Sequence, residues 1–173
     1  MTPAQRRYLL VEQGLGSVVV NFALNAAIAW LMFRGVDEVP LWGQASIGGD
    51  TIGTSFFLPL ITCLVVTRVA RGAVRTGHVA ALDWTRATHP VLRVLPRATL
   101  LRGLALGAAC AAVVGPLATA VFAAAGLAPL RLWPFVVLKA GYAAALGLVV
   151  TPVLALWAIT EAGATTGRPG PRG

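Results

Sequence analysis

Charged side chains are scarce in this sequence. Only 12% of its 173 residues are Asp, Glu, Lys or Arg, whereas 57% are hydrophobic. Soluble domains are about one quarter charged and roughly half apolar, and disordered chains have low hydrophobicity. The composition and a mean hydropathy of +0.78 therefore exclude both classes and predict an integral membrane protein.

The residues that build most catalytic and metal sites are also few. Cys63 and Cys110 are isolated within apolar runs, and His78 and His89 have no carboxylate or cysteine at ligand spacing. No apolar run contains a pair of acids, and no glycine-rich phosphate loop follows a strand. We therefore expect no catalytic residue, no metal and no cofactor, and we rank an integral membrane enzyme third among the possible functions.

Four apolar stretches are long enough to cross a bilayer. A hydrocarbon core of about 30 Å needs about 20 apolar residues in a helix, and a helix satisfies the backbone of such runs in lipid. The sequence thus predicts one all-α membrane domain over residues 1–173, with four transmembrane helices. The predicted spans are residues 14–33, 45–69, 103–127 and 132–160, with a basic loop at 70–101 and a disordered tail at 161–173.

Arginine is distributed unevenly between the two sides of this predicted bundle. Eleven arginines precede the first span, lie from the end of the second span to the start of the third, or follow the fourth, whereas only Arg34 and Arg131 lie on the other side. Lys and Arg are enriched in cytoplasmic loops, so we predict that both termini are cytoplasmic. The Ala-, Leu-, Gly- and Arg-rich composition is typical of bacteria, which indicates the inner membrane.

The basic loop has two interpretations. Its arginines are interleaved with apolar residues, which is typical of a segment lying on anionic lipid headgroups. The alternative is a docking surface for an acidic partner protein or a nucleotide. We favour the lipid, and the position of the arginines between spans argues against nucleic acid despite the net charge of +8. The candidate contact residues are Arg68, Arg71, Arg75, Arg86, Arg93 and Arg97.

Two segments of the chain resemble one another. Gly35–Trp42 aligns with Gly126–Trp133 at a shift of 91 residues, with Gly, Leu and Trp identical, and a shift of 93 aligns Pro59 with Pro152. We interpret this as a duplicated helical hairpin, and chance similarity within a biased composition is the alternative. Two such hairpins would be related by a pseudo-two-fold axis along the membrane normal, as in some transporters.

Lys139, the only lysine, lies about seven residues into the fourth span. A charge near the centre of a membrane helix costs about 2.5–3.5 kcal/mol, so it needs a partner or a function. Asp50 enters the second span at nearly the same depth, and we predict an ion pair between them. The pair would either join the two hairpins or serve as a gate or ion site, and the alternative is that Lys139 snorkels to the interface.

Polar side chains recur every four residues along the first span, at Gln13, Ser17, Asn21 and Asn25. Positions four apart share one face of a helix, and amides in hydrocarbon need partners, so this stripe should face protein or a water-filled path. The second span offers Thr51, Thr54, Ser55 and Thr62 as possible partners if the stripe faces protein. Asn21, Asn25 and Thr54, together with Asp50 and Lys139, are the candidate pathway residues.

The third span carries small residues, including Gly103, Gly107 and Gly115, on one face. Such faces allow close helix packing within a chain or between copies. We predict a small transporter or channel for a small polar or ionic solute, assembled as a homo-oligomer. The alternative is a non-catalytic membrane subunit or scaffold whose basic loop docks a partner protein or anionic lipid.

Overall fold

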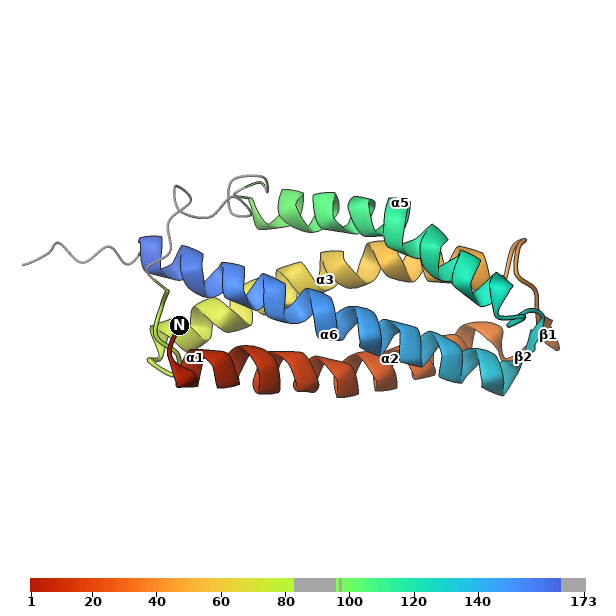
Figure 1. The fold of residues 1–173 in the computed structure, drawn as a ribbon, viewed down its shortest axis with the longest axis horizontal. Helices are drawn as coiled ribbons and strands as arrows, with labels where there is room; N and C mark the ends of the chain where they lie inside the picture. Colours follow the sequence, from red (N-terminus) through yellow and green to blue (C-terminus); the bar gives the residue numbers. More distant parts are fainter. Residues whose placement is uncertain (83–95, 97, 166–173) are drawn as a thin grey trace, which may run out of the picture.

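The computed structural model describes residues 1–82, 96 and 98–165. Helices contain 79% of these residues, in four long bundled rods (Figure 1). The first rod comprises α1 (Pro3–Arg7), the π-helical segment η1 (Tyr8–Leu15) and α2 (Gly16–Phe33). The other three are α3 (Ile47–Arg75), α5 (Thr99–Ala124) and α6 (Leu132–Thr165). All four are long and apolar enough to span a membrane.

The first helix begins well before the apolar run at 14–33. Pro3 occupies its first turn, and Thr2 and Gln5 form a capping box in which each side chain bonds the backbone of the other. Gln5 Nε2 also donates to Ala80 O at 2.9 Å. Capping therefore extends the helix through a polar stretch that hydropathy alone does not include.

The basic loop and the tail are shorter than predicted. α3 continues through Arg75 and α5 begins at Thr99, so the connection covers residues 76–98 instead of 70–101. The prediction of a disordered tail from residue 161 is wrong for its first five residues, because α6 continues to Thr165. Burial of Ala162, which is 6% exposed, ties this last turn to the bundle. Residues 166–173 lie outside the described residues.

The two helices of each predicted hairpin, α2 with α3 and α5 with α6, are not packing partners. α3 and α6 pack together at the centre, α5 packs on α3, and α2 packs on α6, whereas α2 and α3 have few contacts (Figure 1). The two hairpins are therefore interleaved. The arrangement leaves a groove between α2 and α3 with α6 beneath it.

A two-stranded sheet closes one end of the bundle. β1 (Glu38–Val39) in the α2–α3 connection pairs antiparallel with β2 (Leu130–Arg131) in the α5–α6 connection. Glu38 lies opposite Arg131, and Val39 lies opposite Leu130. Val39 is fully buried, so the sheet ties the two connections together and covers this end of the core.

The small-residue face of α5 packs inside the chain. A Cβ atom added at Gly107 would lie 2.6 Å from Phe56 O, and one at Gly103 would lie 2.9 Å from Leu60 Cδ1. Both neighbours belong to α3, so glycine allows the two backbones to approach closely. This face is consequently not free for self-association. Homo-oligomerisation remains a prediction with no surface assigned to it.

We expect Gly107→Ala to lower the melting temperature of the detergent-solubilised protein, because the added methyl meets a backbone carbonyl that cannot move aside. Overpacking of this kind costs about 1–3 kcal/mol. Gly141→Ala is the matched control, since nothing lies within 4 Å of its added Cβ, and it should be neutral or slightly stabilising. Equal melting temperatures for the two variants would contradict the close α3–α5 packing.

Candidate functional site

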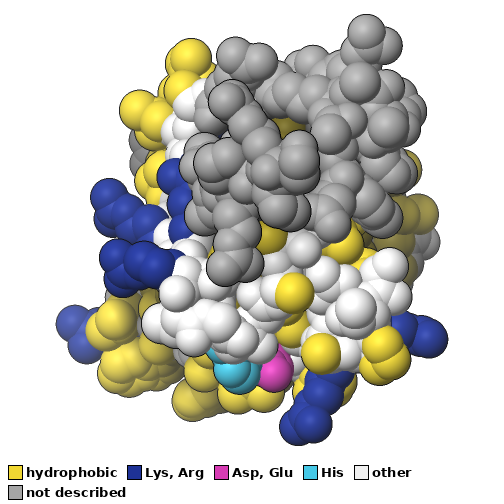
Figure 2. Space-filling model, turned by 90° about the vertical axis from the view of Figure 1, so that its left-hand side faces the viewer, with side chains coloured by type: hydrophobic (Ala, Val, Ile, Leu, Met, Phe, Trp, Pro, Cys, Tyr) yellow, Lys and Arg dark blue, Asp and Glu magenta, His cyan; other side chains and the backbone are white. Residues whose placement is uncertain are grey.

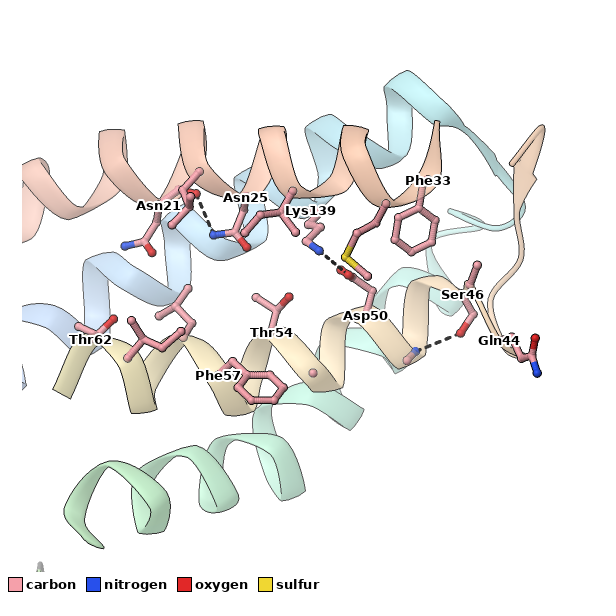
Figure 3. Close-up of a pocket in the computed structure, with 18 residues that line it drawn as sticks. Asn21, Asn25, Phe33, Gln44, Ser46, Asp50, Thr54, Phe57, Thr62 and Lys139 are labelled. Carbon is pink, nitrogen blue, oxygen red and sulfur yellow. Dashed lines mark hydrogen bonds and ion pairs between the residues drawn. The ribbon is translucent and has the colours of Figure 1, made fainter. Parts of the chain in front are cut away.

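A cavity of about 550 Å³ occupies the groove between α2 and α3 (Figure 3). We call it the vestibule. Gln44 and Ser46 lie at its outer end, beside the β1–β2 sheet, and it extends along the groove to Asn21 on α2 and Thr62 on α3. Its other polar lining residues are Asn21, Asn25, Asp50, Thr54, Thr62 and Lys139. All five candidate pathway residues from the sequence thus lie around one cavity.

The predicted contact between Lys139 and Asp50 is present. Lys139 Nζ donates a hydrogen bond to Asp50 Oδ1, and the two side chains are only 5% and 10% exposed. Asp50 lies in the first turn of α3, whose N-cap Ser46 accepts from Gly49 N at 3.2 Å. A carboxylate is favoured at a helix N-terminus by the helix dipole. The pair joins α3 to α6 where both line the vestibule.

The asparagine stripe faces the vestibule, but its hydrogen bonds are not those expected. Asn21 Nδ2 donates to Ser17 O and Asn25 Nδ2 donates to Asn21 O, each at 2.9 Å. The prediction that hydroxyls of the second span bind these amides is wrong, because α2 does not pack on α3 and each amide bonds the preceding turn of its own helix. In the described part of the chain, neither amide oxygen has a hydrogen bond, so both can bind water or solute.

The hydroxyl groups of α3 divide into two sets. Thr51 and Ser55 are buried and donate to the carbonyl oxygens four residues earlier, at 2.7 Å each, and Ser55 Oγ lies 2.5 Å from Tyr142 Oη. The Ser55–Tyr142 contact joins α3 to α6. Thr54 and Thr62 instead line the vestibule, so only this second set can contact a solute.

A glycine on α6 allows the stripe to lie close to the bundle. A Cβ added at Gly147 would overlap the amide nitrogen of Asn21. The absence of a side chain at Gly147 thus positions Asn21 against α6 and within the vestibule wall.

Apolar packing closes the opposite half of the bundle. η1, α3 and α6 contribute buried residues that include Tyr8, Leu9, Val66, Leu154 and Ile159. This set, which we call the apolar plug, lies between the inner end of the vestibule and the arginine-rich end. The bundle therefore holds the vestibule in one half and a packed apolar core in the other.

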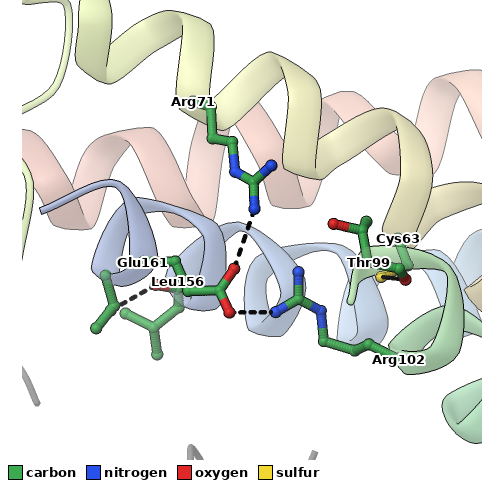
Figure 4. Close-up of polar contacts among 7 residues, drawn as sticks. Cys63, Arg71, Thr99, Arg102, Leu156 and Glu161 are labelled. Carbon is green, nitrogen blue, oxygen red and sulfur yellow. Dashed lines mark hydrogen bonds and ion pairs between the residues drawn. The ribbon is translucent and has the colours of Figure 1, made fainter. Parts of the chain in front are cut away.

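A second cluster of charges lies at the arginine-rich end (Figure 4). Glu161 on α6 accepts from Arg102 Nη1 at 2.9 Å and from Arg71 Nη2 at 3.3 Å. Arg102 is 1% exposed, and its guanidinium carbon lies 5.0 Å from the centre of the Trp157 ring. The carboxylate thereby joins α3, α5 and α6.

Sequence reasoning missed this cluster because it placed Glu161 in the tail and Arg102 among the loop arginines. A signal was present. Trp157 and Glu161 are four residues apart and share a face of α6. This face lies at the arginine-rich end, where an acidic and an aromatic side chain can both bind arginine.

The remaining candidate lipid or partner contacts have different environments. Arg68 and Arg75 are exposed, whereas Arg71 is exposed but paired with Glu161. Arginine side chains lie around the edge of this end of the molecule (Figure 2). The predictions for Arg86, Arg93 and Arg97 fall outside the described residues.

The described residues contain no group of three or more His, Cys, Asp and Glu side chains that could hold a metal ion. Cys63 and Cys110 are both free thiols. Cys63 is buried, and its Sγ lies 3.5 Å from Thr99 O, which joins α3 to the start of α5.

Comparison of the chain with models of protein families, with curated proteins and with solved structures gives no match. Function must therefore be argued from the geometry of the vestibule itself.

Removing one member of the Asp50–Lys139 pair should destabilise the protein more than exchanging the two charges. Asp50→Ala and Lys139→Ala each leave a buried charge without its partner, which costs about 3–5 kcal/mol. We expect each single variant to lower the melting temperature in detergent, and the charge-exchanged double variant to recover part of the loss. The double-mutant cycle separates this coupling from each residue's other contacts.

Asp37→Ala is the control for the cycle, because Asp37 is exposed on the α2–α3 connection. Its effect should remain within about 0.5 kcal/mol. Additive effects of the two single variants, with no recovery in the exchanged pair, would mean that the pair contributes no coupling energy.

Proposed function

We propose that this chain is a multi-pass protein of a bacterial inner membrane that carries a small polar or ionic solute through the vestibule. One observation carries the proposal: a cavity with charged, amide and hydroxyl lining lies within a bundle whose outer surface is apolar. Polar lining is costly in a membrane protein and marks solute or ion pathways.

Exposed apolar side chains support membrane insertion. The four helices contain 18-residue windows with mean hydropathies of 1.7 to 2.1. On the outer helices α2 and α5, Val19 is 69% exposed, Val113 is 64% exposed and Leu117 is 63% exposed. Apolar faces of this extent indicate contact with lipid tails.

The position of the arginines supports an orientation of the bundle in which the arginine-rich end is cytoplasmic. The ends of the helices bring Arg6, Arg7, Arg75 and Arg102 to one end of the bundle, whereas the β1–β2 end carries Arg34 and Arg131 among the described arginines. By the positive-inside rule, the arginine-rich end faces the cytoplasm and lies against anionic headgroups. The vestibule then opens on the outer side of the membrane.

The strand pairing supports an internal duplication. Val39 pairs with Leu130, its equivalent at the shift of 91 residues, so a pseudo-two-fold axis would pass between these two residues. The same axis would exchange the α2–α6 contact with the α5–α3 contact. Two interleaved hairpins give the central helices α3 and α6 equivalent roles, which suits a rocking movement of one repeat against the other.

Unpaired buried polar atoms support a second conformation. Within the described residues, such atoms belong to Tyr8, Thr67, Arg102, Thr151 and Trp157, all in the half that contains the apolar plug. Each costs about 1–3 kcal/mol when it lacks a hydrogen bond. We infer that water reaches them when the plug opens and the vestibule closes, so that solute is released on the cytoplasmic side.

The alternative function, a membrane subunit whose basic loop docks a partner protein, has less support. Exposed Arg68 and Arg75 are explained by ordinary contact with headgroups, whereas a docking role does not explain why polar residues line the vestibule.

Single cysteines, introduced into a chain without Cys63 and Cys110, test whether water enters the vestibule and which way the protein is oriented in the membrane. In intact cells, an impermeant thiol reagent should modify cysteine at Gln44 and at Thr54, because both line the vestibule. It should not modify cysteine at Val19, which faces lipid, and it should modify cysteine at Thr76 only after the cells are permeabilised. Modification at Thr76 in intact cells would reverse the orientation, and protection at Thr54 would indicate a dry cavity.

Flux measurements in liposomes test transport itself. The purified protein should raise the uptake of at least one member of a panel of ions, sugars and amino acids above that of protein-free liposomes. Replacing Asn21 and Thr54 together by leucine fills the vestibule and should abolish this flux. Val19→Leu, on the lipid-facing side of α2, should leave it unchanged. No flux for the whole panel, or full flux through the filled vestibule, would overturn the proposal.

A further inference from the structure

The Asp50–Lys139 pair leaves much of its hydrogen-bonding capacity unused. An ammonium group has three donors and a carboxylate has two acceptor oxygens, yet within the described residues Lys139 Nζ bonds only Asp50, and only through Oδ1. A buried ion pair offsets its desolvation cost only when the remaining donors and acceptors are also satisfied. Because both residues line the vestibule, the missing partners must come from what fills it.

The charges around the vestibule cancel. Asp50 and Lys139 are its only charged lining residues among those described. A ligand with one charge could pair with one of them but would leave the other uncompensated in a poorly hydrated site. A ligand that carries both an ammonium and an anionic oxygen can pair with both at once, so the site remains neutral before and after binding.

The rest of the vestibule wall is largely apolar. Ile28 and Met32 contribute from α2, and Phe57, Leu58 and Ile61 contribute from α3. A ligand that places its charged groups at Asp50 and Lys139 therefore meets apolar side chains on both sides. Ligand sites commonly combine apolar walls with a few placed polar groups.

We propose that the vestibule binds a small zwitterion with an apolar substituent, of the chemical class of an apolar amino acid. Its ammonium group pairs with Asp50, its anionic oxygen pairs with Lys139, and its apolar substituent lies between α2 and α3. The identification of this ligand as the transported solute rests on the proposed function.

The internal repeat does not duplicate this charged pair. In the internal alignment, Asp50 corresponds to Gly141 or Ala143, and Lys139 corresponds to Gly48 or Ser46, depending on the shift used. The equivalent positions therefore carry no charged pair, and binding should saturate at one ligand per chain.

Matched ligands test the requirement for both charges. The protein is purified in a non-ionic detergent, and its melting temperature is followed as ligand is added. L-leucine and L-phenylalanine should raise it saturably. Isopentylamine and phenethylamine lack the carboxylate, and 4-methylpentanoate and 3-phenylpropanoate lack the ammonium. Each should need at least about tenfold higher concentration, because one charged hydrogen bond is lost.

Variants test the site. The double variant Asp50→Asn with Lys139→Met removes both charges together, so it avoids an unpaired buried charge, and circular dichroism checks that it is folded. It should lose the stabilisation by both amino acids. Asp37→Asn, on the exposed connection, should retain it. Equal stabilisation by zwitterions and singly charged analogues, no stabilisation by either amino acid, or full stabilisation of the double variant would each overturn the proposal.

Two further measurements, binding of a short-chain phospholipid and flux in liposomes, distinguish the zwitterion site from a lipid site and from transport. Stabilisation by dihexanoyl phosphatidylethanolamine, with no effect of either amino acid, would assign the site to a lipid headgroup and overturn the solute proposal. Saturable amino-acid binding without flux in liposomes would support the site and contradict transport. Flux of another solute without amino-acid binding would support transport and contradict the zwitterion.

Discussion

The contact between Lys139 and Asp50 is the interaction on which the rest of the molecule depends. It joins the two central helices, α3 and α6, near the β1–β2 end, and it forms part of the vestibule wall. Two opposite charges can remain in an apolar bundle only if they are paired, and the pair benefits from any further hydrogen bonds. The same contact thus stabilises the bundle and places the two charged side chains of the described lining at the cavity wall.

Interleaved packing explains why a cavity is present beside this pair. Because α2 packs on α6 and α5 packs on α3, the loop-connected helices α2 and α3 remain apart with α6 beneath them. Asparagine and threonine side chains line the space between them, whereas the other half of the bundle is closed by the apolar plug. A second charge cluster, around Glu161, joins α3, α5 and α6 at the far end. Movement between two conformations would have to rearrange contacts at both ends.

The sequence predicts the four helices and the Asp50–Lys139 contact because hydrophobic length and the cost of a buried charge are local properties. The spacing of Asn21 and Asn25 alone also predicts that both lie on one face of the first helix. The packing partners of α2 could not be predicted, because they depend on how two apolar surfaces fit, which periodicity does not report. Glu161 was missed because hydropathy ends a span at its last apolar residue, whereas the helix continues for as long as its side chains find partners.

The chain contains a single lysine, so its side-chain amine can be observed without overlap. Solid-state NMR of the protein in liposomes, labelled with ¹⁵N-lysine and ¹³C-aspartate, measures the separation between Lys139 Nζ and an aspartate carboxyl carbon and detects transfer of polarisation from water. We expect a protonated amine at about 3–4 Å from that carbon, as hydrogen-bond geometry requires, in contact with water and with the coupling lost in Asp50→Asn. A neutral amine, no aspartate coupling or no contact with water would contradict a charged pair at the wall of a wet vestibule.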